Sequence, residues 1–75
     1  MRLKVELTFP VQLKDEPIIY YMGQKYKIIP NIIEASFSTK TGWALLVLEG
    51  EQAEIDKALE FVKNKNIAIN VLGNV

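Results

Sequence analysis

The chain of 75 residues contains no cysteine and no histidine. Disulfide bonds are therefore excluded, and zinc and haem sites lose the ligands that they most often use. Catalysis by a Cys–His or Ser–His pair is also excluded, because the base is missing. A single domain over residues 1–75 buries only about 60% of its unfolded surface. We therefore expect its stability to come from a well-packed core or from self-association.

The chain has no excess of positive or negative charge, since nine basic residues balance nine acidic residues. Nucleic-acid binding needs a basic surplus that displaces counterions from phosphates, so no nucleic-acid partner is expected. No apolar run approaches the roughly 20 residues of a transmembrane helix. The N-terminal segment alternates apolar and polar residues, unlike the core of a signal peptide. The sequence therefore predicts a cytoplasmic domain without direct membrane insertion.

Groups that could carry chemistry are sparse. The four glycines are isolated from one another and form no phosphate-binding loop. The carboxylates are spread along the predicted surface elements, which is typical of solvated or helix-capping charges rather than of an acid–base pair. We therefore expect a protein that is not an enzyme and that holds no cofactor.

Hydrophobic periodicity predicts six elements. Alternation over residues 3–9 indicates a strand that ends at Pro10. Helical spacing then predicts a helix with Asp15 as its N-cap and Tyr26 near its end. The remaining elements are a strand over about 28–39, a strand over 43–48, a helix over 51–65 and a strand over 67–71. In the strand over 28–39, alternation places Ile33, Ala35 and Phe37 on one common face. Between the two middle strands, "TKTG" is expected to form the turn, with Gly42 free to adopt a positive φ.

This order of elements predicts an α+β fold, the ferredoxin-like βαββαβ plait. Right-handed crossovers place the first and third strands side by side in a four-stranded antiparallel sheet, with both helices on one face. The other face of the sheet is then uncovered.

The third predicted strand is apolar on both faces, which favours self-association. Parity places Trp43, Leu45 and Val47 on one face and the smaller set that begins at Ala44 on the other. We expect the Ala44 set to pack beneath the helices and the Trp43 set to form a homodimer interface, because tryptophan often anchors interfaces. The alternative is that Trp43 caps the end of the sheet against a helix terminus.

Several short motifs in this order resemble those of the NIL domain family. They are "VELTFP" (5–10), Pro-Ile-Ile (17–19), "NII" (31–33), Gly42, "LLVLEG" (45–50) and "INVLGNV" (69–75), so that the resemblance covers essentially the whole chain. Two positions depart from the family pattern. Ile33 stands where the name of the family has leucine, and Ala35 stands where the family often has glycine.

The resemblance implies one of two settings. In methionine-importing ABC transporters, paired NIL domains at the C-terminus of the ATPase subunit bind methionine and inhibit uptake. In the other setting, the domain is fused to or associated with an iron–sulfur ferredoxin module, as a non-catalytic interaction module. The closing "VLGNV" is similar to the transporter form and the opening "MRLKVELTFP" to the free-standing or ferredoxin-linked form. Both settings stay open at the level of the sequence.

The resemblance also implies a ligand site. Asn31 would hydrogen-bond the carboxylate or the amine of an amino acid, since an amide offers both donors and an acceptor. The apolar side chains of Ile33, Ala35 and Phe37, or else the region of Met22, would receive a thioether side chain. The residues alone allow a simpler interpretation, in which Asn31 satisfies turn backbone groups and the apolar residues belong to the core.

Overall fold

The computed structural model describes residues 1–13 and 15–75. In chain order, its elements are β1 (Arg2–Phe9), a short 3₁₀ helix (Val11–Leu13), α1 (Ile18–Lys25), β2 (Ile28–Phe37), β3 (Gly42–Gly50), α2 (Gln52–Lys63) and β4 (Ala68–Asn74). All six predicted helices and strands are present, and their boundaries differ from the prediction by a few residues.

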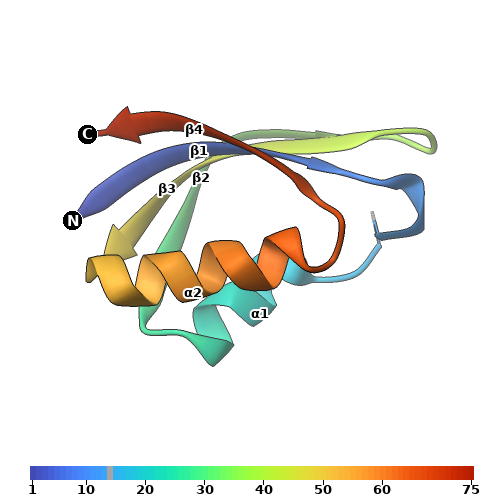
Figure 1. Cartoon of the computed structure of the whole chain (residues 1–75). Coiled ribbons are helices and arrows are strands. Elements are labelled where there is room, and N and C mark those ends of the chain that lie inside the picture. The colour runs from blue at the N-terminus through green and yellow to red at the C-terminus, as the bar shows by residue number, and fades with distance from the viewer. Residues whose placement is uncertain (14) are drawn as a thin grey trace.

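The four strands form one antiparallel sheet in the order β2-β3-β1-β4. Both helices lie on the same face of this sheet (Figure 1), and the two chain termini lie at the same end. The first and third strands are the central pair. The ferredoxin-like plait is therefore confirmed, and β2 and β4 are its two edge strands.

The core lies between the sheet and the helices. Leu7 pairs with Ala44, and Val5 pairs with Leu46, so that these four side chains share the face covered by the helices. The helices contribute five more buried side chains to this core, which are Ile18, Met22, Ile55, Ala58 and Val62. Burying a large aliphatic side chain contributes about 1.5–3 kcal/mol. The alternation of apolar and polar residues in β1 thus predicts which of its side chains enter the core.

The first helix begins later than predicted. Pro17, not Asp15, is the N-cap of α1, and no side chain caps this helix end. Proline disfavours the helical conformation for the residue before it, so Glu16 cannot extend the helix toward Asp15. The loop instead bends, because the N–H of Glu16 donates to the carbonyl of Leu13 at 3.1 Å and its own carbonyl accepts from Ile18 at 2.8 Å.

The turn between β2 and β3 also differs from the prediction. Ser38 holds it, because its backbone N–H donates to the carbonyl of Thr41 at 2.8 Å and its Oγ accepts from the N–H of Thr41 at 3.1 Å. Gly42 is the first residue of β3 rather than a turn residue. It lies between Phe9 on β1 and Phe37 on β2, so its lack of a side chain serves packing.

The run of alternating residues in β2 is interrupted by an irregularity in the strand. Ile32 pairs with Leu46 and Glu34 pairs with Leu45, which leaves Ile33 without a partner on β3. An extra residue in one strand shifts the following side chains to the other face. Ile32, not Ile33, therefore shares the helix-covered face with Ala35 and Phe37, and the predicted common face of Ile33, Ala35 and Phe37 is wrong.

Candidate functional site

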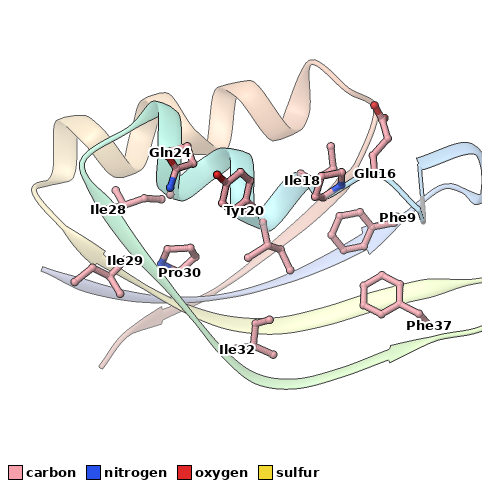
Figure 2. Close-up of a pocket in the computed structure, with 13 residues that line it drawn as sticks. Phe9, Glu16, Ile18, Tyr20, Gln24, Ile28, Ile29, Pro30, Ile32 and Phe37 are labelled. Atoms are coloured by element: carbon pink, nitrogen blue, oxygen red, sulfur yellow. The ribbon is translucent and has the colours of Figure 1, made fainter.

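An apolar groove of about 620 Å³ lies between α1 and the edge strand β2. We call it the α1–β2 groove (Figure 2). Helix α1 contributes Ile18, Ile19, Tyr20, Gly23 and Gln24, strand β2 contributes Ile28, Ile29, Pro30, Ile32 and Phe37, and Phe9, Glu16 and Pro17 complete the lining. The volume lies within the range of about 300–1,000 Å³ that is typical of small-molecule sites.

Two close contacts define the shape of the groove. On its floor, α1 approaches β2 closely, since a Cβ on Gly23 would lie 3.3 Å from Cδ of Pro30. This contact explains a glycine that weakens a short helix by about 1 kcal/mol relative to alanine. At one end, the rings of Phe9 and Phe37 lie 5.5 Å apart between their centroids. The two aromatic rings form an apolar wall at that end.

Polar groups are few in the groove and lie apart from one another. Glu16 lies at the end where Phe9 and Phe37 lie, and Gln24 lies at the opposite end (Figure 2). The hydroxyl-bearing ring of Tyr20 lies between them. Within residues 1–13 and 15–75, Glu16 is the only charged residue in the lining, and its carboxylate points away from the rings of Phe9 and Phe37 (Figure 2). The arrangement suits a small molecule with an apolar body and few polar groups.

The three ligand residues that the family resemblance implies do not line the α1–β2 groove. Asn31 pairs with Val47, and so lies on the sheet face away from the helices. Ala35 pairs with Ala44 on the helix-covered face, and Ile33 lies at the irregularity of β2. The structure therefore does not bring Asn31, Ile33 and Ala35 together on one face of the sheet.

Of the first place suggested for a thioether (Ile33, Ala35 and Phe37), only Phe37 lines the groove. Met22, the centre of the second place, is fully buried in the core. The sequence patterns did not indicate that Glu16, Tyr20, Gln24, Pro30 and Ile32 would line the groove. A signal was present for the helix, since Tyr20 and Gln24 are four residues apart on a stripe beside that of Ile18 and Met22. No pattern revealed Ile32, because the irregularity in β2 cannot be read from the alternation.

Strand β3 directs Trp43, Leu45 and Val47 to the uncovered face of the sheet. Ala44, Leu46 and Leu48 belong to the core cluster, whereas Trp43, Leu45 and Val47 do not. Polar residues flank the outer set on both sides: Lys4 and Asn31 beside Val47, Glu6 and Glu34 beside Leu45, and Thr8 and Ser36 beside Trp43. Val47 is only 5% exposed. The apolar stripe is thus one strand wide, and association through it stays a prediction.

In the described part of the chain, residues 1–13 and 15–75, no three acidic side chains gather as a metal site would require. No helix in these ranges is long and apolar enough to cross a membrane.

The fold and the groove define a small βαββαβ plait domain with a lateral apolar cleft. The family model described as "NIL domain" matches residues 3–71. The chain therefore belongs to the NIL domain family.

Known relatives carry a domain of this kind within a longer protein. The chain is 32% identical over 72 residues to the methionine import ATP-binding protein MetN of Streptococcus mutans, with 91% of this chain and 20% of the relative covered. It is 28% identical over 75 residues to MetN of Bacillus subtilis, with 95% and 22% covered. The chain thus spans about a fifth of the length of these relatives.

A solved structure shares the fold. It is the crystal structure of the C-terminal domain of an ABC transporter ATP-binding protein from Enterococcus faecalis, with a TM-score of 0.79 and 26% sequence identity. The match covers 97% of this chain and 86% of that chain. The plait described above is therefore also the fold of a domain from an ABC transporter ATPase.

Proposed function

We propose that the chain is a cytoplasmic regulatory domain that binds a small amino acid, L-methionine, and modulates the ATPase of a methionine-importing ABC transporter. In this proposal the domain has no catalytic role and acts as a homodimer. The names of the MetN relatives and the C-terminal position of the similar domain in an ABC transporter protein support the setting. The chemistry of the α1–β2 groove supports the ligand.

The groove is the observation that carries the proposal. Its walls are aliphatic and aromatic over most of their length, and Ile29, Ile32 and Phe37 expose 64%, 51% and 49% of their surface. Covering such side chains with a thioether chain removes apolar surface from water, at about 25 cal/mol per Å². A free energy of this origin favours unbranched, flexible apolar side chains, of which methionine is one.

Regulation then follows from differential binding. A ligand shifts an equilibrium between two arrangements of paired domains only if it binds one arrangement more tightly. Since β2 is an edge strand and one wall of the groove, a ligand there contacts an element that is free to meet another chain or domain. In the proposal, the ligand-bound arrangement restrains the attached ATPase.

Two neighbouring isoleucines provide a matched test of the site. Ile32 lines the groove and is 51% exposed, whereas Ile33 does not line it and is 50% exposed. We expect Ile32→Gln to weaken methionine binding at least tenfold, because it places an amide in the apolar wall. Ile33→Gln should change the affinity less than twofold. Isothermal titration calorimetry with L-methionine on the 75-residue chain measures both.

The same titration separates the groove from the site that the family resemblance implies. Asn31→Ala should weaken binding if the amide contacts the ligand, and leave it unchanged if the groove acts alone. No heat with wild-type protein at millimolar methionine would contradict the proposed function. Equal losses in the Ile32 and Ile33 variants would place the ligand outside the groove.

A further inference from the structure

We propose that the ring of Phe37 is the specificity-determining group of the α1–β2 groove, and that it selects a thioether over an aliphatic side chain of the same length. This inference rests on the proposed function, because it concerns the same groove. It assigns the sulfur of L-methionine to the aromatic end of the groove and the amino-acid end of the ligand to the part near Gln24.

The position of the Phe37 ring is fixed by its neighbours. Phe37, Gly42 and Phe9 are paired in one row across β2, β3 and β1. The ring occupies the space that the missing side chain of Gly42 leaves, since a Cβ there would lie 2.6 Å from Cδ1 of Phe37. The Phe9 ring packs beside it, with 5.5 Å between the centroids and 45° between the ring planes. A ring held in this way is preorganised for a ligand.

The same ring is accessible from the groove. Phe9 is buried, whereas Phe37 is exposed over about half of its surface and lines the groove. Figure 2 shows both rings at one end of the groove, with the aliphatic side chain of Ile32 between them and the rest of the β2 wall. A ligand that lies along the groove therefore brings one of its ends to the Phe37 ring.

The polar end of an amino acid fits the opposite end of the groove. Gln24 lies there, and its amide offers donors to a carboxylate and an acceptor to an ammonium group. At the aromatic end, the Glu16 carboxylate points away from the rings (Figure 2). Ile18 and Gln24 are six residues apart on α1, which corresponds to about 9 Å along the helix axis. This length accommodates an extended amino acid with an unbranched side chain.

The chemistry of sulfur decides the sign of the selectivity. L-Norleucine has a methylene group where methionine has sulfur, and its side chain has the same number of heavy atoms. An aliphatic wall favours the methylene group, because hydrocarbon gains more than a thioether by leaving water. An aromatic ring favours the sulfur, which is polarisable and makes favourable contacts at the ring edge. The groove therefore prefers methionine only if the sulfur meets a ring.

Calorimetry on the 75-residue chain with L-methionine and L-norleucine measures this preference. We expect the wild-type chain to bind methionine about fivefold more tightly than norleucine, which corresponds to about 1 kcal/mol. Phe37→Leu should abolish the preference, mainly by weakening methionine, because it keeps an apolar side chain and removes the ring. Phe37→Tyr keeps the ring and should retain the preference.

Two further variants locate the effect. Tyr20→Leu removes another aromatic ring of the lining and should retain the preference for methionine, even if both affinities fall. Phe61→Leu makes the same substitution outside the groove, where the ring contacts Tyr26, and should leave both affinities unchanged. Thermal unfolding of each variant verifies that the fold is retained.

A measurement on the wild-type chain tests the geometry without any variant. We expect a nuclear Overhauser effect between the S-methyl protons of bound methionine and the ring protons of Phe37. Its absence in a saturated complex would place the sulfur elsewhere and overturn the inference.

The outcomes distinguish the inference from the proposed function. If methionine binds but norleucine binds equally well or more tightly, the inference is overturned and the proposed function stands. The same holds if Phe37→Leu retains the preference, or if Tyr20→Leu abolishes it and Phe37→Leu does not. If neither ligand binds the wild-type chain, both proposals are wrong.

Discussion

Gly42 leaves room for the aromatic rings of Phe9 and Phe37, which lie at the ends of β1 and β2. It lies between Phe9 and Phe37 in the sheet, and their rings meet at 5.5 Å. A Cβ at this position would lie 2.6 Å from Cδ1 of Phe37 and 2.8 Å from Cε1. The first ring atom cannot move away without displacing the whole ring. The glycine is therefore explained by packing, although the sequence suggested a turn.

Replacing this glycine should disturb both stability and the groove. We expect Gly42→Ala to destabilise the domain by about 1–3 kcal/mol, the usual cost of an overpacked core position. Because the displaced Phe37 ring lines the groove, ligand affinity should fall as well. Urea unfolding followed by circular dichroism measures the stability. Gly73→Ala is the comparison variant. Nothing lies within 4 Å of a Cβ at position 73, so this variant adds no packing contact, and its effect comes from the φ of 121°, which strains any side chain there.

At the scale of elements, α2 is linked to the connection between α1 and β2 by one carboxylate. Oε1 of Glu54 accepts the backbone N–H of Lys27 at 2.8 Å, and Oε2 lies 3.2 Å from Nζ of Lys57. The backbone hydrogen bond from Lys27 and then the contact with Lys57 hold the pKa of Glu54 below its usual value. Both contacts favour the ionised carboxylate.

The lowered pKa predicts how stability responds to acid. A carboxyl group with a depressed pKa in the folded state stabilises the fold above its unfolded pKa, about 4.3 for glutamate. That contribution disappears as the pH falls through the folded pKa. Glu54→Gln should therefore reduce stability at pH 7 and make the curve of stability against pH flatter below about pH 5. Urea unfolding at several pH values measures this.

A control variant tests the assignment of the effect to Glu54. Glu51→Gln removes another carboxylate at the start of α2 that makes no side-chain cap. An equal flattening of the curve by this variant would show that the overall charge of α2, and not the contact to Lys27, is responsible.

The strands and helices could be predicted because their signals are local. The alternation in β1 and the helical spacing of Ile55, Ala58 and Val62 encode which side chains face the core, and the structure buries all of them as expected. The start of α1 was missed because Pro17 outweighs the capping preference of Asp15.

The candidate site was predictable only in part, because it depends on contacts between elements. The groove needs the approach of Gly23 to Pro30, which joins α1 to β2. It also needs the irregularity after Ile32 that brings Phe37 to the helix-covered face on which Ile32 lies. Neither feature leaves a periodic signal in the sequence. The family motif "NII" lies on β2, one wall of the groove, but of its three residues only Ile32 lines the groove, and Asn31 and Ile33 do not.

At the scale of the whole molecule, apolar side chains remain exposed at both edges of the sheet. Tyr20, Ile29, Ile32, Ile33 and Phe37 are exposed at the β2 side, and Val71, Leu72 and Val75 at the β4 side. The stripe of Trp43, Leu45 and Val47 lies between them on the uncovered face and is bordered by polar residues. A second copy can therefore meet this domain through the uncovered face or through an edge, and these surfaces predict different mutational effects.

We predict that the uncovered face is the homodimer surface. Trp43→Ala removes the largest side chain of the stripe, and residues of this kind often dominate interface energies. The variant should stay folded and should shift toward the monomer, as measured by analytical ultracentrifugation at several concentrations. Ile33→Ala serves as the edge control, because Ile33 is half-exposed on β2 and should leave association unchanged. Dissociation by Ile33→Ala with Trp43→Ala still fully associated would instead identify the β2 edge as the dimer surface.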